Sequence, residues 1–373
     1  MRILIATGIY PPDIGGPATY THMIAKKFAA EGHDVFVLSY GDKQASFSAK
    51  GVQVSLVSRT SNVLVRYMAY FGQLWRLSKH VDVMYAHDLV SVGLCAALVR
   101  SVRSSFRLII RLGGDFLWEK AYAQSFTTRP LSTYYDSSKN MTERFFMKIY
   151  KYVLLKTDHV VFSTSWQQKL YNRFFSVDSS SVIMNAFPDV SPCIYDSSER
   201  TSMRRVLFAG RLIELKNITR LCQVVSSIEK VTLDVVGTGP QKDSLSQYIA
   251  SLPSNVGISF LGYVPHDELL ESFCSYDIIV IPSITEVSPH LLLEAIARGI
   301  PVLLTKECGL VSAFPTIKTF DPFSDEELRM AIESLVDNAT YNAYRIAVQQ
   351  IPHTRGGNDV VDDHLSLFNK LLA

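Results

Sequence analysis

The sequence is poor in the features that mark secreted and membrane-spanning proteins. Its five cysteines are scattered and form no C-x-x-C pair, so we expect reduced, mostly buried thiols in a cytoplasmic protein. No stretch approaches the roughly 18 apolar residues that a membrane-spanning helix needs. The opening MRILIATGIYPP carries no cleavage pattern and predicts a first strand rather than a signal peptide.

Several signatures of cofactor and metal chemistry are absent as well. The sequence has no H-E-x-x-H or D-x-D arrangement, and we expect no metal site. The loop after the first strand is not G-x-G-x-x-G, and no acidic residue stands where a ribose would need one after the second strand. This pattern disfavours a dinucleotide-dependent oxidoreductase, and we expect no bound cofactor.

What the sequence does contain is enough apolar residues for two cores. Of its 373 residues, 47% are hydrophobic and 19% are charged, which is typical of a globular enzyme. The charge is uneven: residues 1–190 hold 22 Lys and Arg against 13 Asp and Glu, and residues 191–373 hold 15 against 22. Either the first half faces an anionic partner, or two domains differ in charge by chance.

Apolar runs alternate with helical patterns along the whole chain. This alternation predicts parallel sheets with crossover helices, arranged as two doubly wound α/β domains. We place the first domain at 1–188 and the second at 189–354, with the boundary in a Pro-, Ser- and Asp-rich segment at 185–205. The first series of expected strands covers 2–8, 34–40, 52–58, 82–88 and 107–113, and the second covers 159–165, 205–211, 233–237, 258–262, 278–283 and 301–305.

The segment IPSITEVSPHLLLEAIARGIPVL, residues 281–303, is the most informative of the chain. It places Glu286 and Glu294 on either side of an expected helix start, with Ser288 as N-cap and Pro289 in the first turn. A helix N-terminus suits a phosphate, and nearby carboxylates suit sugar hydroxyls. The combination indicates a site for a sugar nucleotide.

A pair of cations follows an expected strand upstream. Arg211 and Lys216 lie in GRLIELKN, directly after VLFAG. Ligands of open α/β sheets bind beyond the carboxyl ends of the strands, where these cations would neutralise a leaving diphosphate. The alternative, two solvated surface residues, is common for Arg and Lys near a turn.

Loops of the first half supply further candidates. Gly15 and Gly16 allow close backbone approach to a phosphate or sugar, or they form a simple turn. His87 ends a strand in MYAHD, where it is either structural or part of a cleft. Asp115 follows Gly113 and Gly114, and it contacts donor or acceptor or else caps the next helix.

Two segments of the first half have the composition of membrane-surface helices. Residues 63–79 and 141–156 combine aromatic and basic side chains with an apolar stripe. In the first, the stripe comprises Leu64, Tyr67, Tyr70, Phe71, Leu74 and Trp75, with Arg66, Arg76 and Lys79 outside it. Such a stripe more often packs on the protein's own sheet, so both interpretations stay open.

The ordered series GRLIELKN, LDVVGTGP, ISFLGYVP, SYDIIVIPS and EVSPHLLLEAIARGIPVL resembles the second half of the retaining glycosyltransferases of family 4. The opening GIYPPDIGGPATYTHMIAKKFAAEGHDVFVL resembles the first half of the same family. The resemblance implies a GT-B fold, in which two Rossmann-like domains face each other across a cleft. It also implies that the last segment, 355–373, is a helix returning to the first domain.

The resemblance assigns roles to individual residues. Arg211 and Lys216 match the clamp on the donor diphosphate, Glu286 the carboxylate that orients the donor sugar, and Glu294 the carboxylate that holds the ribose. The glycine-rich loop closes over the donor, while His87 and Asp115 become acceptor or cleft candidates. The resemblance further places around the donor Gly15, Gly16, Gly237, Val264, Ser288, His290 and Leu291.

This chain departs from the family pattern at two places. The family commonly has Glu-Gly-Phe-Gly where this chain has Glu286, Val287, Ser288 and Pro289, and a proline has no amide to donate. His290 then either bonds the donor phosphate or caps the helix. Many members also carry a histidine where this chain has Gly113.

The resemblance implies a retaining glycosyltransferase that moves a sugar from a nucleoside-diphosphate sugar to a hydroxyl acceptor in cell-surface glycan or glycolipid biosynthesis. The alternatives are a GT-B-fold sugar-nucleotide epimerase and a non-catalytic sugar-nucleotide-binding subunit. We expect a cytoplasmic protein with no metal and no nucleic-acid partner. Its acceptor would be a lipid-linked glycan, and it would contact an anionic membrane peripherally.

Overall fold

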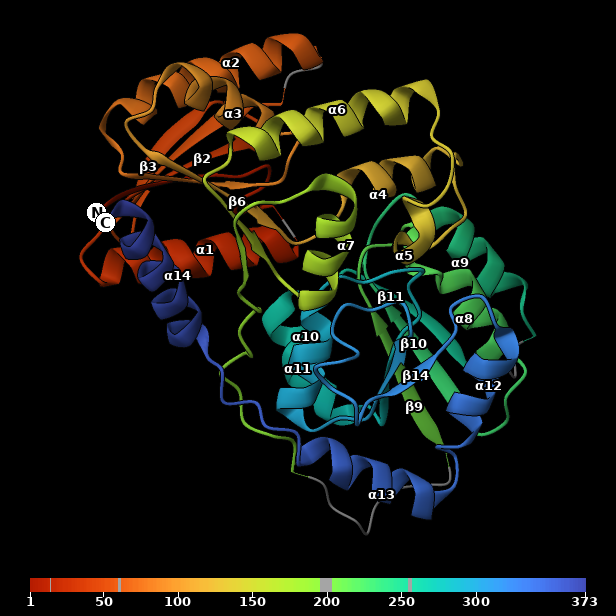
Figure 1. Cartoon of the computed structure of the whole chain (residues 1–373). Coiled ribbons are helices and arrows are strands. Elements are labelled where there is room, and N and C mark those ends of the chain that lie inside the picture. The colour runs from red at the N-terminus through yellow and green to blue at the C-terminus, as the bar shows by residue number, and fades with distance from the viewer. Residues whose placement is uncertain (14, 60–61, 195–202, 254–256) are drawn as a thin grey trace. The chain divides into compact units, whose positions relative to one another are not determined.

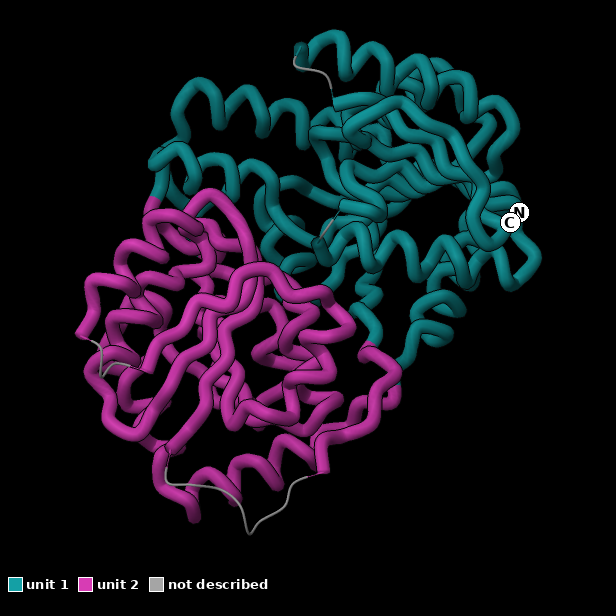
Figure 2. Tube along the Cα trace, turned by 180° about the vertical axis from the view of Figure 1, so that it is seen from behind, with its two compact units in different colours: residues 1–127, 133–186, 355–373 teal, residues 128–132, 187–354 magenta. Residues whose placement is uncertain are grey.

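The computed structural model describes residues 1–13, 15–59, 62–194, 203–253 and 257–373. The chain divides into two compact units (Figure 2). Unit 1 comprises residues 1–127, 133–186 and 355–373, and unit 2 comprises residues 128–132 and 187–354. Residues 195–202, within the segment where we placed the boundary, lie outside the described part of the chain.

Unit 1 is built on a sheet in which the described residues form eight strands in the order β3-β4-β2-β1-β5-β6-β7-β8. Neighbouring strands pair in parallel except β3, which runs antiparallel to β4 at the edge. The strands are β1 (Arg2–Ala6), β2 (Asp34–Gly41), β3 (Ala45–Ala49), β4 (Val52–Ser58), β5 (Val83–His87), β6 (Arg107–Leu112), β7 (His159–Phe162) and β8 (Ser180–Val182).

Helices cover both faces of this sheet. Figure 1 shows α1 and α14 on one face and α2, α3 and α6 on the other. Polar side chains fix several helix starts, because Asn62 caps α2, Asp115 caps α4, and Asn140 with Glu143 forms a capping box on α6. The helices are α1 (Gly16–Ala30), α2 (Val63–Leu77), η1 (Ser78–His80), α3 (Gly93–Val102), α4 (Phe116–Ala123), α5 (Leu131–Tyr134), α6 (Met141–Lys156), α7 (Ser165–Phe175) and α14 (Gly357–Leu372).

Unit 2 has its own parallel sheet, with the strand order β11-β10-β9-β12-β13-β14 in the described residues. Its strands are β9 (Arg204–Ala209), β10 (Val231–Val236), β11 (Ile258–Gly262), β12 (Ile278–Ile281), β13 (Val302–Thr305) and β14 (Lys318–Phe320). Its helices are η2 (Glu214–Lys216), α8 (Ile218–Val225), α9 (Lys242–Ser251), α10 (His266–Ser272), η3 (Phe273–Ser275), α11 (His290–Arg298), α12 (Asp325–Glu333) and α13 (Asn338–Gln349).

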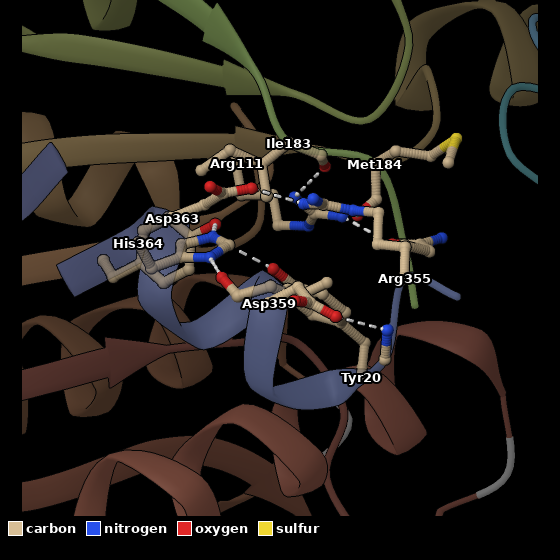
Figure 3. A network of polar contacts seen from close by, with 12 residues as sticks. Tyr20, Arg111, Ile183, Met184, Arg355, Asp359, Asp363 and His364 are labelled. Atoms are coloured by element: carbon tan, nitrogen blue, oxygen red, sulfur yellow. Dashed lines mark hydrogen bonds and ion pairs between the residues drawn. The ribbon is translucent and has the colours of Figure 1, made fainter. Parts of the chain in front are cut away.

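The last helix, α14, packs on α1 in the core of unit 1. Its His364 is fully buried and lies in the polar network of Figure 3. The Nδ1 atom lies 2.6 Å from the Val360 carbonyl, an acceptor only, so Nδ1 carries the proton. Nε2 is therefore the acceptor of the ring, and the hydroxyls of Tyr20 and Tyr85 lie 3.1 Å and 2.8 Å from it.

Arginines anchor the chain segments beside α14. Arg111 donates to the Ile183 carbonyl at 3.3 Å and to Asn185 at 2.6 Å. Arg355 donates to the Met184 carbonyl at 3.3 Å and pairs with Asp363 at 2.6 Å (Figure 3). Two of the four points where the chain passes between the units, at residues 186 and 355, are thus held by side chains of unit 1 itself.

The predicted fold class, α/β with two doubly wound Rossmann-like domains, is confirmed. One strand was assigned to the wrong series, since β7 belongs to the first sheet and not to the second. The short edge strands β3, β8 and β14 were not predicted. β3 is largely exposed and lacks the apolar run that marks a central strand.

The prediction of reduced cysteines was wrong for two of the five. Cys193 and Cys274, 81 residues apart in sequence, form a disulfide in unit 2. No spacing rule links two such distant cysteines, because only the folded chain brings them together. Cys95, Cys222 and Cys308 are buried thiols, and burial raises the pKa of each to about 12. The cysteines therefore no longer argue for a reducing compartment.

The buried state of His364 makes the stability of unit 1 depend on pH. Burial lowers the pKa of His364 to about 3, whereas the unfolded chain protonates this histidine near 6.5. The unfolded state therefore binds more protons below pH 6.5, and falling pH destabilises the fold. Between pH 7 and pH 5, we expect His364 alone to remove about 2 kcal/mol of unfolding free energy.

Urea denaturation at pH 7 and pH 5 measures this effect. His364→Gln, which cannot titrate, should lose less stability than the parent between the two pH values, and His80→Gln at an exposed site should behave like the parent. An equal loss in parent and His364→Gln would show that His364 does not carry the effect.

Candidate functional site

The site in unit 2 begins with two loops that touch through their backbones. Gly210 follows β9, and Gly237 follows β10 with a φ of 148°. A Cβ atom on Gly237 would lie 1.8 Å from the Gly210 carbonyl oxygen, so no other residue fits there. The amide of Leu212 donates to the Thr238 carbonyl at 2.9 Å, which is a second backbone contact between the two loops. Gly237 thus has a structural role, and its place at the donor stays a prediction.

The loop after β9 carries both predicted cations. Arg211 is exposed, and among the described residues its guanidinium makes no ion pair. Lys216 ends the single turn η2 and pairs with Oε1 of Glu286, 70 residues away in sequence. The side chains of Lys216 and Glu286 are 26% and 12% exposed. The structure therefore brings together one residue of each predicted motif.

Glu286 is fixed through its backbone and its side chain. Its amide donates to the Glu307 carbonyl at 2.9 Å, and its carbonyl accepts from the Gly309 amide at 2.9 Å. The Ser283 hydroxyl donates to Oε1 at 2.6 Å. Sequence reasoning missed Ser283, although its position three residues before Glu286 offers a signal for such a contact. The carboxylate enters any reaction already oriented.

Helix α11 starts one residue later than predicted. Its first residue is His290, and Pro289 occupies the N-cap position without a side-chain cap bond. Ser288 therefore lies outside the helix rather than at its N-cap. Ser288, His290 and Leu291 are partly exposed around the first turn, as is Val264 in the loop after β11. Backbone amides at this helix end and its partial positive charge suit an anion.

Glu294, one turn further along α11, is held by a histidine that sequence reasoning missed. His266 Nε2 lies 2.8 Å from Glu294 Oε1, and their side chains are 53% and 13% exposed. The hydrogen bond to Glu294 is the main cause that raises the pKa of His266, against the opposing effect of partial burial. Nothing in the sequence linked the P-H-D-E segment at the start of α10 to Glu294.

In unit 1 the glycine-rich loop leads directly into α1, which starts at Gly16. Gly15 has a φ of 150°, in the region that favours glycine. The amides of Ala18 and Thr19 donate to its carbonyl at 3.0 and 3.1 Å. Ile14 lies outside the described residues. Gly15 and Gly16 carry no side chain of their own, as close approach of a ligand to the backbone would require.

His87 lies buried at the end of β5. The Thr21 hydroxyl donates to the Pro17 carbonyl at 2.7 Å, so it must accept from His87 Nδ1 at 3.0 Å. Nε2 is then an unprotonated acceptor, and it has no hydrogen-bond partner among the described residues. Burial, with the charge of Arg111 nearby, lowers the pKa of His87 well below its ordinary value. His87 is a neutral base facing inward.

Asp115 occupies a closed cluster of hydroxyls. Its carboxylate is 1% exposed and accepts from the Trp118 amide at 2.9 Å, which caps α4. It also accepts from Tyr135 at 2.7 Å, Tyr171 at 2.8 Å and Tyr150 at 3.4 Å. Burial raises the pKa of Asp115 despite these donors. The capping role therefore describes Asp115 better than contact with a substrate does.

Within the described residues, no group of three or more His, Cys, Asp and Glu side chains is arranged to hold a metal ion. In the same part of the chain, no helix is long and apolar enough to cross a bilayer. Positive charge at the unit 2 site comes instead from Arg211, Lys216 and the start of α11.

Comparison with known protein families assigns the chain to one of them. Residues 14–188 match the family described as Glycosyltransferase Family 4, and residues 196–350 match Glycosyl transferases group 1. The chain belongs to glycosyltransferase family 4. Both matches run in the order of the two units, and the family predicted from the motifs is confirmed.

Individual relatives of this family 4 protein are distant but cover most of it. An uncharacterised glycosyltransferase of Methanocaldococcus jannaschii is 26% identical over 343 residues, 83% of this chain and 82% of that protein. The GPI3 subunit of phosphatidylinositol N-acetylglucosaminyltransferase from Saccharomyces cerevisiae is 24% identical over 334 residues, 85% of this chain and 71% of that subunit.

Solved structures establish the fold of the family 4 chain. HepE from Anabaena, in complex with UDP-glucose, superposes with a TM-score of 0.73 at 16% identity, covering 99% of this chain and 100% of that one. The GT-B fold is thereby confirmed.

The contact between His266 and Glu294 predicts that a substitution of Glu294 changes the pKa of His266. Because this hydrogen bond is the main cause of the raised pKa of His266, Glu294→Gln should lower that pKa toward its ordinary value. Asp267→Asn is the matched control, since Asp267 contributes less and is fully exposed. NMR titration of the His266 ring signals measures the pKa of His266 in the parent and in both variants. An unchanged pKa in Glu294→Gln would mean that the two side chains do not pair in solution.

Proposed function

We propose that this glycosyltransferase retains the anomeric configuration and moves a sugar from a nucleoside-diphosphate sugar to a hydroxyl acceptor, in the synthesis of a cell-surface glycan or glycolipid. The observation that supports this most is the ion pair of Lys216 with Glu286 at the carboxyl ends of β9 and β12, with Arg211 in the same loop as Lys216. Together these residues combine two cations for a diphosphate with an oriented carboxylate for sugar hydroxyls.

Unit 2 would bind the donor. Lys216 and Arg211 would meet the diphosphate, the start of α11 would add its amides, and Glu294 would accept from the ribose hydroxyls. The Anabaena structure holds UDP-glucose, which supports a nucleotide-sugar donor for this chain also. Ser288, His290, Leu291, Val264 and Gly237 would complete the donor contacts of unit 2, and Gly15 and Gly16 would add amides from unit 1.

In the reaction we propose, the bond between the anomeric carbon and the diphosphate oxygen breaks, and its electron pair leaves with the diphosphate. The acceptor hydroxyl then attacks the sugar cation from the same face and gives its proton to the departing diphosphate. No protein nucleophile is needed. The cations of unit 2 stabilise the charge that grows on the leaving group, so we propose that no metal ion is required.

This mechanism predicts the effect of removing each cation. Arg211→Gln and Lys216→Gln should lower turnover more than donor affinity, by about 2 to 4 kcal/mol in the barrier, because they act on charge that develops late. Lys230→Gln is the matched control, since Lys230 is exposed at the amino end of β10. Steady-state transfer assays, run with and without a chelator, measure these effects.

Four outcomes would contradict the proposal. Near-normal turnover in both variants would end the diphosphate assignment, and a chelator-sensitive rate would end the metal-free mechanism. An altered sugar on the nucleotide with no transfer product would identify an epimerase. Binding of the donor without either reaction would identify a non-catalytic subunit.

The acceptor side of the proposal rests on one face of unit 1. Helices α2, α3 and α6 lie side by side there (Figure 1) and together carry seven Lys or Arg against one acidic residue. That residue, Glu143, is buried in its capping box. Eight apolar side chains on these helices are more than half exposed: Val63, Leu64, Val65, Met68, Val102, Met141, Phe145 and Leu155.

Such a face suits an anionic membrane surface and a lipid-linked acceptor. The yeast relative's name includes phosphatidylinositol, which supports a lipid acceptor for this chain as well. Core packing explains only part of α2, because Tyr70 and Leu74 are buried while Leu64 and Met68 are not. We propose that the exposed face of α2 meets the membrane, while its buried face packs on unit 1.

Vesicle co-sedimentation at low and high salt checks the membrane contact. The parent should bind anionic vesicles and release them in high salt. Arg76→Glu with Lys79→Glu should reduce binding at least 30-fold, since each charge contributes about 1 kcal/mol. Lys230→Glu with Lys242→Glu changes the net charge equally on exposed sites of unit 2. A parent that stays in the supernatant at low salt would show that this face is merely solvated.

A further inference from the structure

Unit 1 contains a cavity of about 260 Å³ at the carboxyl ends of β1 and β2, beside the first turns of α2. Ligands of parallel sheets bind at this end. The volume is below the roughly 300 to 1,000 Å³ of pockets for drug-sized ligands, so it suits a head group and not a whole lipid. The cavity is lined in part by Gly8, Tyr40, Arg59, Arg66, Tyr67 and Ser91.

We propose that this cavity binds the phosphodiester group of a glycerophospholipid acceptor. Arg66 would be its principal ligand, and the acyl chains would lie along the exposed face of α2. This inference rests on the proposed function, because it names the chemistry of the acceptor for the same transfer reaction.

The charges in the cavity match a single negative charge. Arg59 is already paired: its Nη1 lies 3.0 Å from Asp13 Oδ1, its Nη2 contacts Asp13 Oδ2, and Asp42 lies 3.6 Å away. Arg66 is half-buried, and among the described residues its guanidinium has no carboxylate partner. Its Cζ atom lies 5.7 Å from the Tyr40 ring centroid. One uncompensated cation suits a phosphodiester monoanion better than a diphosphate.

The other polar groups of the cavity do not oppose an anion. Tyr40 donates to the Ser91 carbonyl at 3.1 Å, and Tyr67 donates to the Val90 carbonyl at 3.2 Å. Burial raises the pKa of both phenols, to about 12 for Tyr67, so both stay neutral. The nearby Asp88 is half-buried, and its carboxylate accepts from Ser91 Oγ and from the amides of Val90 and Val92.

An apolar track begins within one helical turn of Arg66. Leu64, Val65 and Met68 are 69%, 54% and 66% exposed on the outer side of α2. The helix carries no acidic residue. A ligand with one anionic group joined to long apolar chains would contact both the cation and the apolar face of α2. A free phosphate would contact only the cation.

Calorimetry on the full chain tests the inference with dihexanoyl-phosphatidylglycerol below its micelle concentration, so that no membrane is present. The parent should bind this probe, and Arg66→Gln should bind about 10- to 100-fold more weakly, because one charge-assisted contact is lost. Arg76→Gln, on the same helix but outside the cavity, should bind like the parent. Inorganic phosphate should bind the parent much more weakly, and neutral dihexanoylglycerol should not bind measurably.

Equal binding by parent and Arg66→Gln, no binding by the parent, or phosphate binding as tightly as the phospholipid would each overturn the inference. A second variant, Leu64→Gln with Met68→Gln, should weaken binding of the phospholipid and leave binding of deacylated glycerophosphoglycerol unchanged. Tighter binding of a polyprenyl diphosphate than of the phospholipid would also overturn it. The proposed function fails separately, when no sugar is transferred from any nucleotide sugar.

Discussion

Parallel pairing of β9 with β12 is the constraint on which the unit 2 site depends. It brings the loops after the two strands to the same edge of the sheet, so Lys216 reaches Glu286 across 70 residues of sequence. The loops are joined further by the Ile284 amide, which donates to the Leu215 carbonyl at 2.9 Å. A shift of this pairing would separate the cation from the carboxylate, and no local feature of either loop would restore the contact.

Charges around this site are compensated before any ligand arrives. Glu286 pairs with Lys216 and accepts from Ser283, and Glu294 pairs with His266. Half-buried carboxylates without such partners would cost free energy through lost hydration. Each carboxylate has a second oxygen with no ion pair among the described residues. Arg211 differs, because it is exposed and can remain solvated until an anion binds.

Unit 1 separates its polar groups in another way. Its interior holds neutral imidazoles, His87 and His364, and a carboxylate, Asp115, surrounded by tyrosine hydroxyls. Outside, α2 and α6 carry further positive charges that make no ion pair among the described residues, and these lie beside exposed apolar side chains. Buried polar groups there stabilise the packing of α14 and α4, while the outer helices remain available to a partner.

The sequence by itself determined the fold class and the family. Period-two and period-3.6 apolar patterns are local, and motifs such as GRLIELKN and EVSPHLLLE are contiguous, so both can be recognised without coordinates. Only the tertiary structure decided the remainder. The disulfide of Cys193 with Cys274, the placement of β7, and the partners Ser283 and His266 depend on which distant segments become neighbours. The roles of Asp115 and His87 could not be predicted from the sequence either. Burial distinguishes a capping or packing residue from a catalytic one, and burial is a property of the whole fold.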